Sequence, residues 1–469
     1  MSDPASVSSA GSVRNQTPLP GGHLSLTQLV SISLATFVPA VGIALAPSLL
    51  LRTAGPAAWS ASLMSMIAII SLGLVVIAFA KRYVGTGSIY SYLGHVFGPW
   101  ARLVSGAALL LGFALQTAAG LAIVGIFTGS FLYSMGVENA VDVGPQLVIY
   151  FIALLIATAV ALRGLDTSIV VATIFTVVSL PLVLLITGSS VAHTGLELAT
   201  QLDFTGFSLN ATLQGVAAGA SFLIGFEACT VLAVESKNPK RSIPFAVMSV
   251  PVVLGLLYLA CTFAQMPGLI ETSGDVEAGM SPTSALALNA GLGEGIAKAT
   301  DLVLAISIFA SLIGFINFGS RFAIALAQDN LLPSALNRVN KKYQSPFVAI
   351  FSQGALGLAA VLTLIAITGG IVSGYTGLAT LIVYTWSVPY VLMACGAIKL
   401  MLLEKRWSPL LLVAAVVGAG VMIYSYLLGW IYPLPAPLDR MTWLFAVLIA
   451  LILASCLVFR KLRLRKSSN

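Results

Sequence analysis

The sequence is poor in charge. Asp, Glu, Lys and Arg make up only 8% of its 469 residues, whereas 58% of the residues are hydrophobic. A soluble domain carries about 25% charged residues, so this chain cannot cover a surface that faces water. The composition therefore excludes a soluble globular protein. The apolar runs are long and continuous, unlike the alternating segments of about 10 residues that form barrel strands, and they predict an all-α polytopic membrane protein.

Residues that bind metals or perform catalysis are also scarce. The three histidines fall in the N-terminal tail or in predicted loops, and the four cysteines lie in apolar segments without C-x-x-C spacing. These features argue against a metal site, a disulfide framework and an intramembrane enzyme with a Ser/His or Asp/Asp pair. The sequence also lacks the phosphate-binding pattern G-x-x-x-x-G-K-[ST], a selectivity filter and a ring of charge. We therefore expect no cofactor, no self-powered pump and no channel.

Uncharged runs of about 20 residues predict twelve membrane-spanning helices. The predicted spans are residues 26–51, 57–80, 101–135, 144–162, 167–190, 209–234, 243–266, 298–328, 346–366, 374–398, 409–430 and 441–459. Residues 1–25 are rich in Ser, Gly and Pro and lack the basic start and short apolar core of a cleaved signal. They are expected to form a disordered N-terminal tail.

Basic residues are distributed unevenly over the two sides that twelve spans define. Of the 23 Lys and Arg residues, 19 fall on the side of the termini, including the basic tail at residues 460–469. Only Arg52, Lys298 and Arg440 lie on the other side, and Arg321 lies inside a span. Short loops rich in Lys and Arg stay in the cytoplasm, so we expect cytoplasmic termini in a multi-pass protein of the cell membrane. The Lys and Arg residues are scattered among short loops beside the lipid and form no single basic patch, which argues against a nucleic-acid partner.

Two predicted spans contain helix breakers near their middle. The first span holds Pro39 and Gly42, and the sixth holds Gly219, Gly225 and the ionisable Glu227. Proline removes a backbone donor and clashes with the preceding turn, and backbone groups freed inside a membrane need a cavity, a neighbouring helix or a ligand. Either break alone is typical of a packing kink. Two breaks five spans apart indicate a transporter binding site built from discontinuous helices.

An interrupted helix exposes N–H groups with partial positive charge on one half and carbonyl groups on the other. Such a site holds a carboxylate and an ammonium without charged side chains, so it suits a zwitterion. Glu227 is the only clear carboxylate in the middle of a predicted span, where an ionisable group is costly. Three roles for it stay open: neutralising a substrate amine, carrying a coupling proton, and accepting hydrogen bonds from the broken helix.

Four stretches of the chain form a recognisable set. The most specific is Glu235-Ser-Lys-Asn-Pro-Lys-Arg-Ser-Ile-Pro244, preceded by Gly225-Phe-Glu227. The others are Gly85-Thr-Gly87-Ser-Ile-Tyr90-Ser-Tyr92, Ser320-Arg321 with Asp329-Asn-Leu-Leu-Pro333, and Ser345-Pro346. Together they resemble the amino acid/polyamine/organocation (APC) permease superfamily over roughly residues 26–460. The resemblance implies a secondary active transporter that moves an amino acid or related amine by alternating access. An amino acid or polyamine exchanger of the same fold is the alternative.

Membership implies the LeuT-type fold with twelve transmembrane helices. Residues 26–190 and 209–398 would form two inverted five-helix repeats with helices one and six broken, and residues 409–459 would add helices eleven and twelve. The substrate would bind at helices one and six, with helices three, eight and ten nearby. The implied substrate-binding residues are Val38, Pro39, Ala40, Val41, Gly42, Phe222, Leu223, Ile224, Gly225, Phe226, Glu227, Gln116, Ser307, Tyr375 and Thr376.

The sequence departs from the pattern of this superfamily at two places. The usual glycine pair of helix one appears as Pro39-Ala-Val-Gly42, which alters the cradle for a substrate carboxylate. Some members carry a helix-five lysine in place of a sodium ion, whereas Ser179 stands there in this chain. Ser179 and Glu227 are therefore the candidates for a coupling-ion site. The expected partners are a small-molecule substrate, a proton or sodium as coupling ion, and membrane lipid.

Overall fold

The protein is helical throughout the region that the structure describes. The computed structural model describes residues 24–83, 88–163, 165–203, 207–340, 343 and 345–467. Within these ranges, extended pairing is limited to one isolated bridge between Leu24 and Ser236. Ten helical runs of the described residues are long and apolar enough to cross a membrane. These observations confirm an all-α, multi-pass membrane protein.

Each predicted span coincides with one helix or with consecutive helices. The first half of the chain contains α1 (Leu26–Thr36), α2 (Pro39–Ala54), η1 (Gly55–Ala57), α3 (Ala58–Ala80), α4 (Ser88–Phe97), α5 (Pro99–Ser134), η2 (Glu138–Val141), α6 (Val143–Ala161), α7 (Leu165–Thr194), α8 (Leu198–Gln201) and α9 (Leu209–Ala220). The second half contains η3 (Phe226–Glu235), α10 (Pro239–Ser249), the π-helical turn η4 (Val250–Leu254), α11 (Gly255–Glu271), α12 (Ser273–Glu277), α13 (Pro282–Asn289), α14 (Glu294–Gln328), η5 (Ser334–Asn337), α15 (Phe347–Thr368), α16 (Ile371–Glu404), α17 (Pro409–Ile431), η6 (Leu438–Arg440) and α18 (Met441–Ser467).

The first predicted span is interrupted between α1 and α2. Helix α1 begins at a capping box, in which the Ser25 hydroxyl accepts from the Gln28 N–H and the Gln28 side chain accepts from the Ser25 N–H. It ends at Thr36, and Pro39 opens α2, where its missing N–H costs nothing. Between them Val38 has a φ of 43°. A β-branched residue rarely adopts positive φ, so Val38 is a strained joint of the kind that is found at ligand sites.

The sixth predicted span is interrupted between α9 and η3. Helix α9 ends at Ala220, whose carbonyl accepts hydrogen bonds from the N–H groups of Leu223 and Ile224, both at 2.9 Å. The chain resumes as a 3₁₀ helix at Phe226, directly after Gly225 with a φ of 90°. Both predicted interruptions are therefore present. The described residues form ten long apolar runs and not twelve. Neither segment 26–51 nor segment 209–234 forms one long helix, and α2 belongs with α3 to the single run Pro39–Ala80.

The two interrupted segments lie side by side. Helix α2 packs on α9, whereas α1 packs on η3 and α10. At the start of α1, the Leu24 carbonyl accepts a hydrogen bond from the Lys237 N–H at 3.0 Å, next to the Leu24–Ser236 bridge. This pairing brings the two breaks to the same level of the bundle.

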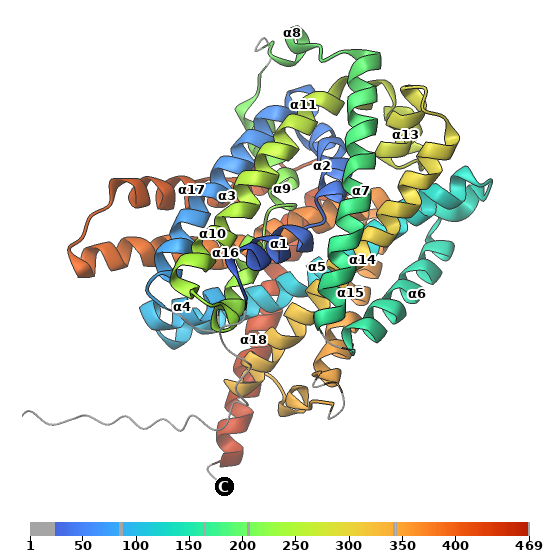
Figure 1. The fold of residues 1–469 in the computed structure, drawn as a ribbon. Coiled ribbons are helices and arrows are strands. Elements are labelled where there is room, and N and C mark those ends of the chain that lie inside the picture. The colour runs from blue at the N-terminus through green and yellow to red at the C-terminus, as the bar shows by residue number, and fades with distance from the viewer. Residues whose placement is uncertain are drawn as a thin grey trace, which may run out of the picture.

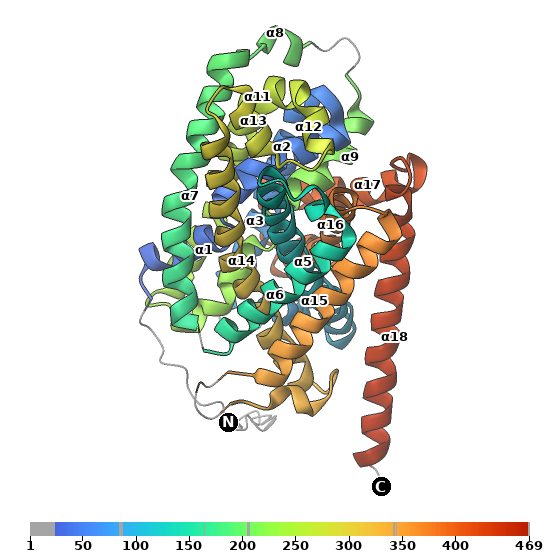
Figure 2. The same ribbon diagram turned by 90° about the vertical axis from the view of Figure 1, so that its right-hand side faces the viewer.

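Long helices surround the interrupted segments (Figure 1). Helix α5 contacts α14, α15 and α16, and α3 packs against α9 and α17. Close approach of α5 and α16 depends on Gly112, where an added Cβ would lie 2.7 Å from the indole nitrogen of Trp386. In the view of Figure 2, α7 and α18 run along opposite edges of the bundle, and α5 and α14 lie between them.

Candidate functional site

A small cavity lies where the two interruptions meet. Phe37 and Val41 line it at the first interruption, and Ser221 and Phe222 line it at the second. Helices α5, α14 and α16 complete the wall with Gln116, Ala119, Ile123, Ile308, Ser311, Phe315, Tyr375, Ala379 and Ile382. The cavity volume is about 50 Å³, and a single water needs about 10–15 Å³ on this measure. A larger solute must therefore displace side chains to enter.

The lining of this cavity is uncharged. Its polar side chains are those of Gln116, Ser221, Ser311 and Tyr375, and its other side chains are apolar. An ionic solute must therefore be stabilised by hydroxyl, amide and backbone dipoles. The N-terminus of α2 supplies a dipole with partial positive charge, although Pro39 has no N–H and the N–H groups of Val41 and Gly42 already donate to the Val38 carbonyl, at 2.9 and 3.5 Å.

Glu227 lies in the first turn of η3 and lines neither this cavity nor the smaller one beside Gly225. Its side chain is buried, and its Oε2 accepts a hydrogen bond from the Tyr390 hydroxyl of α16 at 2.6 Å. The Tyr390 oxygen in turn accepts from the Gly225 N–H at 3.1 Å. Glu227 and Tyr390 therefore tie the second interruption to α16, with the Tyr390 hydroxyl, rather than the carboxylate, accepting from the Gly225 N–H.

Comparison with known proteins places the chain in a family. A family model described as "Amino acid permease" matches residues 24–459. The chain belongs to the amino acid permease family. It is 23% identical over 315 residues to the branched-chain amino acid permease BcaP of Bacillus subtilis (strain 168), covering 65% of this chain and 67% of the relative. It is 25% identical over 300 residues to the serine/threonine exchanger SteT of the same organism, covering 62% and 65%. The chain thus spans about two thirds of the length of each relative.

A solved structure supports the expected fold. A Na⁺-coupled sialic acid symporter, in a substrate-bound outward-open state, matches with a TM-score of 0.53 and 14% identity over 86% of this chain and 89% of that chain. At this identity the likeness concerns the fold alone. The family match and the shared LeuT-type fold confirm the resemblance to the APC superfamily.

The structure places the expected substrate-binding residues of this permease family member in three groups. Val41, Gln116, Phe222 and Tyr375 line the cavity. Gly225 and Phe226 line a smaller neighbouring cavity with Ser33, Thr36, Phe37, Ala228, Cys229 and Phe318. The remaining expected residues are buried around the interruptions or on nearby helices without lining either cavity: Val38, Pro39, Ala40, Gly42, Leu223, Ile224, Glu227, Ser307 and Thr376. The coupling-ion candidate Ser179 is buried on α7.

Several lining residues were not expected from the sequence, although helical periodicity connects them to those that were. On α5, Ala119 and Ile123 follow Gln116 by three and seven positions. On α16, Ala379 and Ile382 follow Tyr375 by four and seven. This spacing puts residues on one helix face. On α14 the lining residues are Ile308, Ser311 and Phe315, so the expected Ser307 is one position, or about 100° of helix rotation, away from the cavity face.

Asp301 is a second buried carboxylate within a predicted span, near the start of that span and not in its middle, where Glu227 was singled out. It lies on α14 within the predicted span 298–328, and its side chain is fully buried. The hydroxyls of Ser130 and Ser281 each donate to one of its oxygens at 2.5 Å, and the Ser281 N–H donates to the Ser130 oxygen at 2.8 Å. This network joins the end of α5, the start of α13 and the start of α14.

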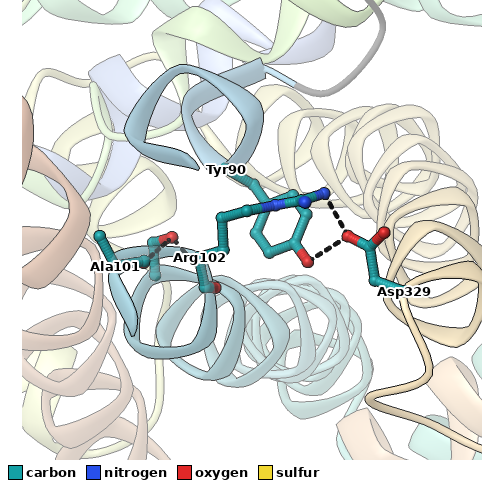
Figure 3. A network of polar contacts seen from close by, with 5 residues as sticks. Tyr90, Ala101, Arg102 and Asp329 are labelled. Atoms are coloured by element: carbon teal, nitrogen blue, oxygen red, sulfur yellow. Dashed lines mark hydrogen bonds and ion pairs between the residues drawn. The ribbon is translucent and has the colours of Figure 1, made fainter. Parts of the chain in front are cut away.

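A second polar network joins α5 and α14 at their other end (Figure 3). The guanidinium of Arg102 and the hydroxyl of Tyr90 both donate to Oδ2 of Asp329, directly after α14. The guanidinium also lies over the Tyr90 ring, 4.9 Å from its centroid. Burial and the hydrogen bond to Asp329 raise the pKa of Tyr90, so its hydroxyl stays protonated and remains a donor. Two motifs of the sequence, around Tyr90 and Asp329, thus meet in one contact.

Proposed function

We propose that this chain is a secondary transporter that moves an amino acid across the cell membrane by alternating access. The observation that carries the proposal is the cavity between two helix interruptions, lined by uncharged side chains. Helix ends at such a cavity offer N–H groups to a carboxylate and carbonyl groups to an ammonium, so a zwitterion can bind without charged side chains. The family match and the permease and exchanger among its relatives support this function.

The proposed topology has twelve spans, with the two interrupted segments crossing the membrane as helices one and six. Residues 26–190 and 209–398 would be inverted repeats, followed by two further helices at residues 409–459. The excess of Lys and Arg on one side supports cytoplasmic termini. Alternating access would then be a movement of the interrupted helices relative to α5 and α14, which pack closely along their length.

The proposed substrate is an amino acid with an apolar side chain. Most of the lining is apolar, including Val41, Ile123, Ile308 and Phe315, and such a surface favours burial of an aliphatic group. The relative BcaP, a branched-chain amino acid permease, supports this choice. A polyamine is disfavoured, because a dication needs carboxylates and none lines the cavity. Ser179 and Glu227 stay the candidates for a proton or sodium site.

Uptake into proteoliposomes tests the proposal. Purified protein is reconstituted and assayed with radiolabelled branched-chain, hydroxylated and basic amino acids and with polyamines, first with a proton gradient and then with a sodium gradient. We expect saturable uptake of branched-chain amino acids driven by one gradient. Uptake only into vesicles preloaded with amino acid would identify an exchanger instead. If no solute is taken up under any condition while the protein transforms one chemically, the transporter function is wrong.

A further inference from the structure

Tyr258 of α11 has a buried hydroxyl that finds no protein partner. The residue is 3% exposed, and its hydroxyl makes no hydrogen bond to any described residue. A hydroxyl buried in this way loses its hydrogen bonds to water without replacing them, which destabilises the fold. Such groups are few in proteins, and each requires an explanation.

The surroundings of Tyr258 connect it to the cavity. Its ring and hydroxyl lie against Gly42, the fourth residue of α2, so closely that an added Cβ at this position would overlap them. On another side, the ring of Phe222 meets it edge-on, with centroids 6.2 Å apart. Phe222 and Val41, the neighbour of Gly42, both line the cavity. Displacement of the Phe222 ring by an entering solute would therefore open the cavity toward the Tyr258 hydroxyl.

We propose that the Tyr258 hydroxyl donates a hydrogen bond to the carboxylate of the transported amino acid at the first turn of α2. The inference rests on the function proposed above. Pro39 has no N–H, and the N–H groups of Val41 and Gly42 already donate to the Val38 carbonyl, at 2.9 and 3.5 Å, so this turn offers few free donors beside the phenol. The cavity lining contains no cation that could take their place. Gly42 is required beside them, because any side chain there would push the phenol away from the helix. Tyr258 thus adds a buried donor beside α2 to the amide and hydroxyl groups of the lining.

Tyr150 of α6 provides a matched comparison. Its hydroxyl is also buried without a partner among the described residues, and its ring also lies against a glycine of a neighbouring helix, Gly125. Neither Tyr150 nor Gly125 lines the cavity. Tyr150 shares the burial and the glycine contact of Tyr258 but not its position beside α2. Tyr150→Phe therefore measures the effect of removing a buried phenol that does not lie beside the cavity.

The experiment compares wild-type protein, Tyr258→Phe and Tyr150→Phe in proteoliposomes, with the amino acid that the wild type transports and with its α-carboxamide as a competitor. A hydrogen bond to a charged group is worth more than one to a neutral group. For Tyr258→Phe we expect the KM of the amino acid to rise about tenfold or more, and the inhibition constant of the carboxamide to rise a few-fold at most. Tyr150→Phe should leave both constants unchanged.

Thermal unfolding without substrate distinguishes this role from a structural one. Because the hydroxyl has no protein partner, Tyr258→Phe should leave the Tm unchanged or raise it. A lower Tm, an unchanged KM, or equal losses for the amino acid and its carboxamide would each overturn the assignment of Tyr258. Failure of the proposed function would look different, because then the wild-type protein itself would transport no amino acid.

Discussion

The pair of helices α5 and α14 is held together at its two ends by different chemistry. At one end the carboxylate of Asp301 is fully buried and accepts from two neutral hydroxyls, those of Ser130 and Ser281. At the other end Asp329 is partly exposed and meets the cation of Arg102 and the Tyr90 hydroxyl. A buried carboxylate depends on all its donors, whereas an exposed ion pair is weakened by salt and replaced by water at little cost. We therefore expect the Asp301 end to be the more rigid of the two and the Asp329 end to open more easily.

Replacement of Asp301 should have the largest effect on stability. Asp301→Ala leaves the hydroxyls of Ser130 and Ser281 without an acceptor in a buried site, which costs about 3 kcal/mol or more. We expect a strongly lowered Tm in detergent and poor recovery of folded protein, with Asp301→Asn intermediate because one oxygen remains. Asp329→Ala is the matched variant at the other end. A Tm loss for Asp329→Ala as large as that for Asp301→Ala would contradict the comparison.

Glu227 sharpens the comparison, because it is buried like Asp301 but lies beside the helix interruption. Glu227→Gln keeps the size of the side chain and an oxygen that accepts from Tyr390, so we expect only a small Tm change. Transport should fall about tenfold or more if the charge is used during the cycle. Lys237→Gln, which changes a charge on the exposed side chain just after η3, is the control at equal expression. Equal losses of transport in the two variants would show that Glu227 has only a structural role.

Sequence reasoning located the interruptions because their causes are local. Pro39 has no N–H to continue a helix and opens α2, and Gly225 adopts a φ that other residues avoid, so each break depends on a few adjacent residues. Proline alone does not decide the matter, because Pro47 lies inside α2. The residues that line the cavity can be predicted from the sequence only in part. The sequence predicts Ser307 as the lining residue of α14, whereas Ile308 lines the cavity. The rotation of a nearly uniformly apolar helix cannot be deduced from the spacing of its polar and apolar residues.

The buried network of Asp301 was missed for a different physical reason. Its two donors come from Ser130 and Ser281, which are far from it in the sequence, and serine is too common in spans to mark a site. Asp301 lies within the predicted span 298–328, but it stands close to the charged Lys298 and Glu294 at the start of the helix, where a further charge attracts no notice. In contrast, the motifs around Tyr90 and Asp329 are both recognisable in the sequence, yet neither motif indicates that the two side chains are in contact. Only the close packing of α5 on α14 brings them together.

The Asp329 end should show a smaller effect that depends on salt. In Asp329→Asn the ion pair with Arg102 is lost, but the hydrogen bond from Tyr90 can persist through the remaining oxygen. We expect a loss of about 1 kcal/mol or less at low salt, measured as Tm, and a smaller difference from wild type at high salt. If this end opens during transport, Asp329→Asn should change the transport rate clearly even though the Tm changes little. A Tm loss that does not respond to salt would mean that this end is as rigid as the Asp301 end.

The pair between Arg82 and Glu404 should have the smallest effect of all. Arg82 donates from Nε and Nη2 to the two oxygens of Glu404, at 3.1 and 2.8 Å, and both side chains are about one third exposed. This geometry is bidentate, but among the residues that the structure describes no hydroxyl bonds to Glu404 and no aromatic ring lies under the guanidinium as Tyr90 does at Asp329. Glu404→Gln should therefore lower the Tm less than Asp329→Asn does, and the loss in the free energy of unfolding should be a few tenths of a kcal/mol at most.

Glu294→Gln, which removes a single contact to Lys298, is the control. A larger loss for Glu404→Gln than for Asp329→Asn would show that Tyr90 adds nothing to the Asp329 contact, because the two ion pairs are otherwise similarly exposed.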